Sequence, residues 1–411
     1  MREKDKIMSM VNRICPVCNS NDADEIYSNP NYKIMDARGI LYHTPIYYVI
    51  CNCCAHIYQN PAPDKEEYKQ FYSNAMITPS VNLDEEYERG ELHWRVFVEM
   101  MDGYFKGLLS KISVLEIGCG NGYLLHKLNE MFSLKIASLK GIEPSVRLSE
   151  RANSLAGIEV ENKFLDDIDF DTQYDLIIMD NVFEHLDFPI MDLHKIRRIL
   201  KEYGIIYISV PNLFLSTSGI RDIFAGHPSN YGIENFMVLM EKAGFWVEKY
   251  RYISTWLVTK VRFKKEDEKL SDFNFDKIRD EVGKQFQVFV SKNRLLTDEI
   301  KSFLEIEIEK MVFNSQKLLI FGAGEHTLEL LDRLDFKNIV IGLIDNNKVY
   351  QGNVRMEYPV YSPEDLGNLN YDKILLSSNA FEWEMKKTLL DKGIPEAKII
   401  PIYEILSQNS S

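Results

Sequence analysis

The stretch Val114-Leu-Glu-Ile-Gly-Cys-Gly-Asn-Gly122 decides the fold. Its apolar residues predict a buried strand that ends at Ile117 and runs directly into a glycine-rich turn. Apolar residues then recur at helical spacing from Leu124 to Phe132, so a helix should follow the turn. A turn of this kind lets a ligand approach the backbone, and a helix start offers unpaired N–H groups. The stretch therefore predicts a ligand-binding strand–turn–helix unit.

An acidic residue ends the next apolar run, Gly141-Ile-Glu143-Pro144. In strand–turn–helix–strand units an acid at this place can accept hydrogen bonds from both hydroxyls of a ribose. Dinucleotide-binding folds use the same logic, so the glycines alone do not separate the classes. Together with the acid before the first glycine, these residues resemble the cofactor motifs of class I S-adenosylmethionine-dependent methyltransferases. The resemblance implies that the cofactor is bound by Glu116, Gly118, Gly120, Gly122 and Glu143.

Strands and helices alternate along the middle of the chain, which favours parallel strands with helices on both faces. Two more strands, at 246–252 and 255–262, should finish the sheet as a hairpin. The expected fold class is α/β, with a class I methyltransferase Rossmann-like core between an N-terminal zinc-binding module and a smaller C-terminal Rossmann-like domain. The five parallel strands are expected at Ser113–Ile117, Leu139–Ile142, Ile158–Asn162, Tyr174–Met179 and Ile205–Val210.

Five of the six cysteines lie in the first segment. Cys15-Pro-Val-Cys18 and Cys51-Asn-Cys-Cys54 are two C-x-x-C motifs, and two such motifs complete a tetrahedral zinc site. Four protein ligands leave no open position, so Zn²⁺ would be structural. Disulfides are the alternative, and Cys53 could replace Cys51 or Cys54.

Further polar residues stand where the predicted strands end, at the edge where open α/β sheets bind ligands. Asp166 follows the third strand and could meet an adenine amino group, although loop acids are usually only solvated. Asp180 and Asn181 end the fourth strand and are assigned to the cofactor, whereas Asn212 ends the fifth and is assigned to the substrate.

Two histidines are candidates for proton transfer, which suits imidazole near neutral pH. His185 follows the fourth strand, and its alternative role is to cap a helix or to pack. His227 lies in a long loop, where Gly226 and Pro228 flank it, and the alternative interpretation is that it is a plain surface histidine. The same loop offers Arg221 for substrate contacts.

Two other segments carry less specific signals. The helix after residue 63 ends in an aromatic cluster, which either packs or supplies Tyr72 to a substrate lid. Two helices, at 276–292 and 298–313, should precede Gly322-Ala-Gly324, which begins a second strand–turn–helix unit. A lone Gly-x-Gly is a weak signal for a nucleotide site.

The composition of the chain limits the kinds of molecule with which the protein can interact. The chain has 411 residues and a net charge of −14 without a basic block, which argues against nucleic acid as a partner. No run of about 18 apolar residues could span a membrane. We therefore expect a cytoplasmic protein. Its partner should be a small-molecule substrate, and its oligomeric state is left open between monomer and homodimer.

The order of parts resembles the family of zinc-containing deoxysugar C-methyltransferases, which act on nucleotide-linked ketosugars. Asn181-x-x-x-His185, Asp345-Asn-Asn and Pro359-Val-Tyr-Ser-Pro363 also match that family, and His227 falls where the family keeps its catalytic base. The resemblance implies that the tail helps to hold a sugar nucleotide. The four expected parts are a zinc-binding module at 1–63, a methyltransferase domain at 64–264, a helical linker at 265–316 and a Rossmann-like domain at 317–411.

One departure from that family bears on the reaction. The family has Tyr-x-Glu-His ending at its base, but this chain has Phe224-Ala-Gly226-His227. Carbon methylation needs donors that stabilise an enolate, whereas transfer to a hydroxyl needs fewer groups. The prediction is S-adenosylmethionine-dependent methylation, at carbon or oxygen, of a nucleotide-activated or phosphorylated sugar. The alternatives are an NAD(P)-dependent sugar oxidoreductase that uses the tail's glycines and a non-catalytic binding module.

Overall fold

The structure is a computed structural model of the chain. It describes residues 5–35, 40–75, 83–101, 103–155, 157–168, 171–212, 223, 225–253, 256–266, 268, 274–378 and 381–404. For residues 5, 35, 72–75, 83–89, 289–297 and 325 only the backbone is described.

A seven-stranded sheet forms the centre of the molecule, with the strand order β11-β10-β9-β12-β13-β16-β15. The first five strands in this order are parallel, and β16 and β15 close the sheet as an antiparallel hairpin. The predicted fold class is confirmed. The strands are β9 (Ile112–Ile117), β10 (Ile136–Ile142), β11 (Glu159–Glu161), β12 (Tyr174–Asp180), β13 (Leu200–Pro211), β15 (Phe245–Ile253) and β16 (Trp256–Phe263).

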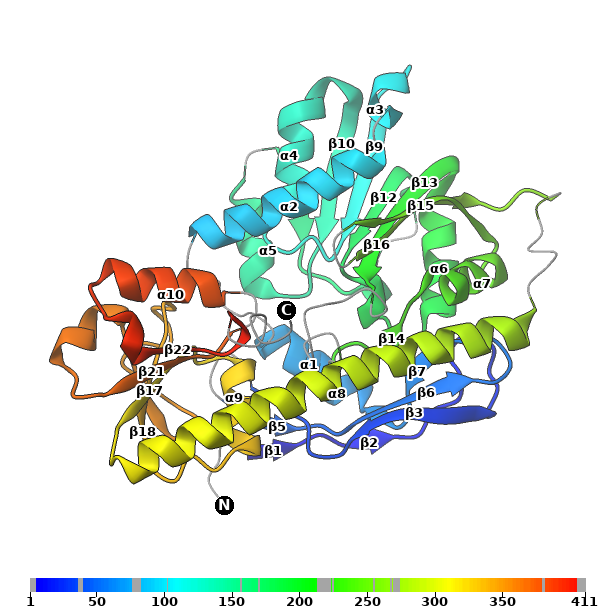
Figure 1. Ribbon diagram of the computed structural model, residues 1–411. Helices are drawn as coiled ribbons and strands as arrows, with labels where there is room; N and C mark the ends of the chain where they lie inside the picture. The colour runs from blue at the N-terminus through cyan, green and yellow to red at the C-terminus, as the bar shows by residue number, and fades with distance from the viewer. Residues whose placement is uncertain are drawn as a thin grey trace.

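Helices cover both faces of this sheet because the buried strands are apolar on both sides. Val114 and Ile178 pack towards α2 and α4, whereas Leu115 and Ile177 pack towards α6 and α7. Figure 1 shows these two groups of helices on opposite sides of the strands. Their bounds are α2 (Leu83–Met101), α3 (Tyr104–Gly107), α4 (Tyr123–Phe132), α5 (Val146–Asn153), α6 (Pro189–Ile199) and α7 (Ile233–Lys242).

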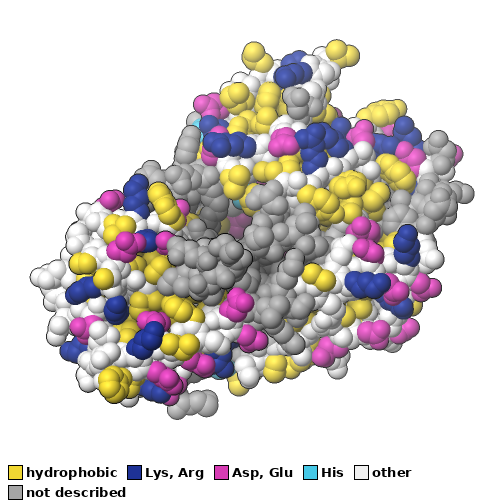
Figure 2. All heavy atoms as spheres, viewed as in Figure 1, with side chains coloured by type: hydrophobic (Ala, Val, Ile, Leu, Met, Phe, Trp, Pro, Cys, Tyr) yellow, Lys and Arg dark blue, Asp and Glu magenta, His cyan; other side chains and the backbone are white. Residues whose placement is uncertain are grey.

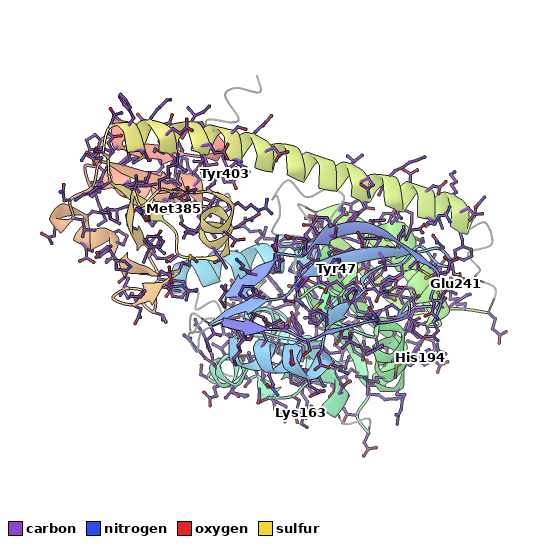
Figure 3. The ribbon with its side chains drawn as sticks, turned by 90° about the horizontal axis from the view of Figure 1, so that it is seen from below. Tyr47, Lys163, His194, Glu241, Met385 and Tyr403 are labelled. Carbon is purple, nitrogen blue, oxygen red and sulfur yellow. The ribbon has the colours of Figure 1, made fainter. Side chains whose placement is uncertain are left out.

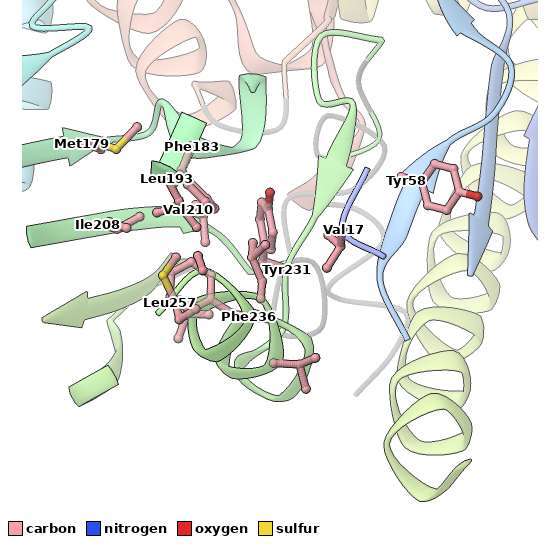
Figure 4. Close-up of a cluster of buried hydrophobic side chains, with 14 of the residues drawn as sticks. Val17, Tyr58, Met179, Phe183, Leu193, Ile208, Val210, Tyr231, Phe236 and Leu257 are labelled. Carbon is pink, nitrogen blue, oxygen red and sulfur yellow. The ribbon is translucent and has the colours of Figure 1, made fainter. Parts of the chain in front are cut away.

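The N-terminal module is built on a four-stranded sheet in the order β14-β7-β6-β3. Its edge strand β14 comes from the segment that follows strand β13 of the seven-stranded sheet, so distant parts of the sequence share one sheet (Figure 1). In Figure 4, Val17 of the module lies beside Tyr231 and Phe236 of the central core. The strands are β3 (Ala23–Asn29), β6 (Ile46–Cys51), β7 (Ile57–Gln59) and β14 (Ser229–Asn230).

Smaller elements complete this module. A three-stranded sheet has the order β1-β5-β4, and β2 pairs with β8. Phe71 of helix α1 packs on Tyr42, so the aromatic cluster of that helix is at least partly core. The elements are β1 (Asp5–Ile7), β2 (Met10–Val11), β4 (Lys33–Met35), β5 (Leu41–His43), β8 (Ala62–Pro63) and α1 (Lys65–Ala75).

A single 39-residue helix, α8 (Phe275–Phe313), replaces the two helices predicted here. The prediction of a break was wrong because Asn293-Arg-Leu-Leu-Thr297 contains no proline or glycine. The first half packs Phe286 against Tyr48 of the N-terminal module, and the second half packs Leu304 into the tail. Figure 3 shows the helix extending across both parts, so it bridges them directly.

The tail is a second α/β unit, as predicted. Its six strands have the order β19-β20-β18-β17-β21-β22 and are parallel except for β19. The division of the whole chain into four parts stays a prediction. The tail elements are β17 (Leu318–Phe321), α9 (Glu325–Arg333), β18 (Val340–Ile344), β19 (Val354–Arg355), β20 (Tyr358–Tyr361), β21 (Lys373–Leu376), α10 (Glu382–Asp391) and β22 (Ile399–Pro401).

The surface in Figure 2 mixes acidic and basic side chains, and they are not segregated into one basic face in that view. Across the described residues, no helix combines the length and the apolar composition needed to cross a membrane.

Candidate methyl-transfer site

A cavity of about 260 Å³ lies at the carboxyl ends of the central strands. It is lined by several residues that the sequence assigned to a cofactor or to catalysis, namely Gly118, Gly120, Glu143, Asp166, Asn181 and His185. Apolar side chains such as Ile117, Leu165 and Phe188 complete the wall. The structure therefore gathers residues from four separate strand ends around one pocket.

The glycine-rich turn needs its glycines for two different reasons. Gly118 and Gly122 have φ angles of 68° and 78°, in the left-handed region that side chains disfavour. A Cβ at Gly118 would lie 2.5 Å from Val182 Cγ2, and one at Gly122 would lie 2.8 Å from Ala152 Cβ. Gly120 shares the left-handed backbone, with a φ of 54°, but a Cβ there would meet nothing within 4 Å, so the backbone of this cavity-lining residue is accessible.

Glu143 is oriented by the backbone around it. Its carboxylate accepts hydrogen bonds from the N–H of Gly120 at 3.0 Å and from the N–H of Ser145 at 2.8 Å. Burial raises the pKa of Glu143, although these two donors oppose the shift. A carboxylate has about four lone-pair sites, so Glu143 keeps acceptor capacity for the hydroxyls of a ligand in the cavity.

Glu116 lies deeper, at the end of β9, and is 3% exposed. Its Oε2 has no hydrogen-bond partner among the described residues. Burial, together with the charges of Asp180 and Glu143, raises its pKa well above the ordinary value. A buried cluster of acids favours a positively charged ligand, and S-adenosylmethionine carries a sulfonium and an ammonium group. The chemistry of this site therefore fits the predicted cofactor.

Two residues at the end of β12 face in different directions. Asp180 does not line the cavity; it accepts a hydrogen bond from Ser209 Oγ and lies 2.7 Å from His93 Nδ1. Asn181 does line it, has a left-handed φ of 52°, and its Oδ1 has no partner in the described part of the chain. Asn181 thus has an amide oxygen available for a ligand, whereas a cofactor role for Asp180 stays a prediction.

Asp166 is surrounded by lysines that the sequence gave no reason to place there. Its carboxylate lies 3.2 Å from Lys65 Nζ, 3.3 Å from Lys69 Nζ and 2.5 Å from Lys195 Nζ. Burial would raise the pKa of Asp166, but hydrogen bonds from Lys195 and Lys65 outweigh it and hold the pKa well below its usual range. Lys65 and Lys69 also line the cavity, so its rim carries cationic groups.

The two predicted histidines are brought together, with ring centroids 4.9 Å apart. His185 Nδ1 lies 2.7 Å from the carbonyl oxygen of Gly226. Because a carbonyl only accepts, Nδ1 carries the proton and the lone pair is on Nε2. Burial lowers the pKa of His185 to about 4, so its ring is neutral at neutral pH. His227 lies next to His185 and is not itself a lining residue of the cavity.

The loop that carries His227 is held by the N-terminal module. The carbonyl oxygen of His227 accepts hydrogen bonds from Tyr48 Oη at 2.8 Å and from Gln59 Nε2 at 3.1 Å. Gln59 Nε2 also lies 3.1 Å from the Ala225 oxygen, and β14 directly follows this loop. The N-terminal module therefore helps to position a predicted catalytic residue.

The three residues predicted to bind the substrate are not found in the cavity among the described atoms. Asn212 is buried and is not a lining residue. The backbone of Tyr72 lies in α1, but its side chain is outside the described atoms, and Arg221 is outside the described residues. Their substrate roles stay predictions.

The predicted zinc site can be tested against the distances expected for tetrahedral coordination by four thiolates. The thiols of Cys15, Cys18, Cys51 and Cys54 lie within 4.8 Å of one another, with Sγ–Sγ distances of 3.6 Å for Cys15–Cys54 and 3.4 Å for Cys18–Cys51. A tetrahedral zinc ion with Zn–S bonds of about 2.3 Å separates its sulfurs by about 3.8 Å, so the four thiols fit zinc. Cys53 is exposed and outside this cluster.

The glycine turn of the tail resembles the first one, because an acidic residue after the next strand again accepts hydrogen bonds from backbone N–H groups. Asp345 follows β18 and accepts hydrogen bonds from the N–H of Ala323 at 2.7 Å and of Asn347 at 2.8 Å. Gly322 has a φ of 118° and packs against the Ser377 backbone. The geometry is that of a nucleotide-type turn, and ligand binding there stays a prediction.

Two family models match the chain. The model described as a methyltransferase domain matches residues 96–250, and the model described as C2185-like, N-terminal, matches residues 314–400. A tRNA U34 carboxymethyltransferase of Campylobacter jejuni subsp. doylei is 27% identical over 125 residues, which are 29% of this chain. The chain spans only 42% of the length of that curated relative.

Solved structures that match the chain also include proteins described as methyltransferases. The plantazolicin methyltransferase BpumL in complex with SAH is 17% identical, with 48% of this chain and 94% of that one covered and a TM-score of 0.39. An S-adenosylmethionine-dependent methyltransferase from Mesorhizobium loti is 13% identical, with coverage of 39% and 97% and a TM-score of 0.34. The prediction of an enzyme is confirmed by the family model, which matches a methyltransferase domain to residues 96–250 of this chain.

Proposed function

We propose that the protein transfers a methyl group from S-adenosylmethionine to a nucleotide-activated or phosphorylated sugar. The observation that carries this proposal is the cavity itself, where Glu143 and the Gly118–Gly122 turn stand beside the His185–His227 pair. When bound, S-adenosylmethionine supplies an electrophilic methyl group on a positively charged sulfur.

The roles of the cofactor residues follow from their surroundings. Glu143 accepts hydrogen bonds from the ribose, because its carboxylate is already aimed by two backbone donors. Glu116 provides negative charge beneath the turn, since its buried Oε2 has no other partner among the described residues. Asn181 and Asp166 contact the cofactor from the remaining two strand ends.

His227 is the proposed base, and His185 positions it. His185 stays neutral with its proton on Nδ1, so the ring next to His227 adds no positive charge that would oppose proton transfer to the base. The absent tyrosine and glutamate of the related motif favour transfer to a hydroxyl over transfer to carbon, because an enolate would lack its stabilising donors.

The sugar acceptor is supported by the order of the parts and by charge. The zinc-type module, the Asn181-x-x-x-His185 motif and the tail with Asp345 occur in the order of sugar C-methyltransferases. Lys65, Lys69 and Lys163 line the cavity, where they pair with the carboxylates of Asp166 and Glu161. Although the curated relative acts on tRNA, the net charge of −14 disfavours nucleic acid here.

The test combines calorimetry with mass spectrometry on a panel of nucleotide sugars. The parent protein should bind S-adenosylmethionine and add one methyl group to a sugar of the panel. His227→Ala should lose turnover and keep cofactor affinity, whereas Glu143→Ala should weaken the cofactor by about 100-fold, as expected for losing roughly 3 kcal/mol of hydrogen bonds to a carboxylate. A His227→Ala variant with the parent rate would remove the proposed base. No binding of S-adenosylmethionine by the parent would refute the function.

A further inference from the structure

We propose that Glu184, His185 and His227 form a binding site for a divalent metal ion beside the methyl-transfer cavity, separate from the four cysteines. One carboxylate oxygen and one nitrogen from each ring lie within 4.8 Å of one another. Two imidazoles and one carboxylate are a set found in catalytic zinc and non-haem iron sites. The inference deepens the proposed function, because His185 lines the same cavity.

Glu184 is the residue that points most directly to a cation. It is 3% exposed, at the centre of the short turn η3 (Phe183–His185). Its Oε2 has no hydrogen-bond partner among the described residues. No lysine or arginine forms an ion pair with it within the described part of the chain, since its one such contact is His185 at 4.0 Å. A buried carboxylate in this position is costly unless it is paired, and a metal ion would pair it.

His185 has the hydrogen bond that is typical of metal-bound histidines. Its Nδ1–H donates to the Gly226 carbonyl at 2.7 Å. Metal-ligating imidazoles usually donate their second N–H to a carbonyl or carboxylate, which fixes the tautomer and the ring orientation. The nitrogen with the lone pair, Nε2, is the one 4.0 Å from Glu184 Oε1. The nitrogen that would bind the ion and the N–H that donates to Gly226 are therefore already on opposite sides of the ring.

The three ligand atoms are farther apart than in a metal-bound site, so they must move closer together when the ion binds. A tetrahedral ion with bonds of about 2.1 Å separates its ligand atoms by about 3.4 Å. Glu184 Oε1 and His185 Nε2 are 4.0 Å apart, so they approach by about 0.6 Å when the ion binds. His227 is half-buried, and its ligand nitrogen lies within 4.8 Å of the other two ligand atoms, so it approaches each of them by at most about 1.4 Å.

Three protein ligands would leave at least one position open for an acceptor oxygen. A hydroxyl bound there would lose its proton to solvent more readily, because the ion would lower its pKa. In the proposed transfer, the hydroxyl oxygen would bond to the methyl carbon while the methyl–sulfur bond breaks with its electron pair left on sulfur. In this arrangement the ion would share the activation of the hydroxyl that is assigned to His227 above, and His227 would act by holding the ion next to that hydroxyl.

Cobalt(II) is the probe that separates this site from the cysteines. Full-length protein with zinc already bound is dialysed against Co²⁺, and metal per chain is measured by mass spectrometry. We expect one cobalt per chain in addition to zinc, with an absorption spectrum that lacks the thiolate charge-transfer band of a cysteine site. Glu184→Gln and His227→Ala should each weaken cobalt binding by more than the roughly 10–100-fold typical of losing an outer-shell partner. Both should keep the zinc.

His194→Gln is the matched control, because His194 is an exposed histidine on α6 and is labelled in Figure 3. It should bind cobalt as the parent does. A parent protein that binds only zinc, or a Glu184→Gln variant that binds cobalt with parent affinity, overturns the site. Methylated sugar without cobalt binding also refutes the site and leaves the proposed function standing. Cobalt binding without any methylated sugar supports the site and instead refutes the proposed acceptor.

Discussion

Replacing Gln59 by leucine should separate the binding of the cofactor from the chemistry. Gln59 is fully buried, and its amide nitrogen lies 3.1 Å from the oxygens of Ala225 and His227 and 3.3 Å from Tyr48 Oη. Leucine has a similar volume but no N–H group, so the substitution removes the two amide protons without leaving a large cavity.

The expected loss of stability follows from these contacts. Two hydrogen bonds are worth about 1 kcal/mol each in net terms, and the buried Ala225 oxygen left without this donor adds roughly another 1 kcal/mol. The total of about 3 kcal/mol corresponds to a fall in Tm of roughly 6–12 °C for the unit that contains this sheet. His227 O keeps its bond from Tyr48, so the loop is loosened rather than released.

Scanning calorimetry gives the stability, and titration calorimetry gives the affinity for S-adenosylmethionine. Gln59 does not line the cavity, so cofactor affinity should stay within about twofold while turnover falls by about tenfold or more, as a misplaced catalytic group implies. Gln287→Leu is the matched control, because that glutamine is exposed on α8 and donates a hydrogen bond to the Ile26 carbonyl oxygen, far from the His227 loop in the chain. The reasoning is refuted if Gln59→Leu unfolds at the parent temperature, or if affinity and turnover fall together.

Two further predictions concern charge and metal. Because burial and neighbouring acids raise the pKa of Glu116, its carboxyl is protonated well above pH 4.5 in the absence of a ligand, and ionising it costs stability as the pH rises above that value. Binding of a cationic cofactor should therefore release the proton of Glu116, and its affinity should rise by up to about tenfold per pH unit in that range. Calorimetry in two buffers of different ionisation enthalpy would detect the released proton, and Glu116→Gln should abolish the difference between the buffers. Equal binding heats in both buffers for the parent protein would contradict the prediction. Cys51→Ser should lose zinc and turnover, because structural zinc sites supply folding free energy, whereas Cys53→Ser should keep both. Metal analysis and activity assays of the two variants test this. Zinc retained by Cys51→Ser would disprove the four-thiol site.

The central fold could be predicted because its signals are local. Apolar runs such as Val114–Ile117 and the spacing of the glycines after them require no knowledge of distant residues. The same is true of the cysteines, because each C-x-x-C motif forms within one tight turn. The ends of neighbouring parallel strands meet by geometry, so Glu143 and Asn181 were expected at one edge before any distance was known.

The missed features depend on contacts between distant residues. His93 meets Asp180 across 87 positions, and nothing in the periodicity of helix α2 marks that one histidine. The strand β14 consists of two polar residues, Ser229 and Asn230, which carry no alternating apolar pattern. The lysines around Asp166 come from α1 and α6, and each alone looks like a solvated surface residue.

The pairing of β7 with β14 also has a consequence for how the molecule folds. Tyr58 pairs with Ser229, and His56 bonds the same serine across 173 positions of the chain. Contacts of such separation form slowly, because a long loop must close before they are gained, whereas the local α/β units can form first. During synthesis the N-terminal sheet cannot be complete until residue 230 has been added. The last step of its assembly is therefore also the step that fixes the loop of His227, so folding intermediates that lack this edge strand would lack a finished catalytic centre.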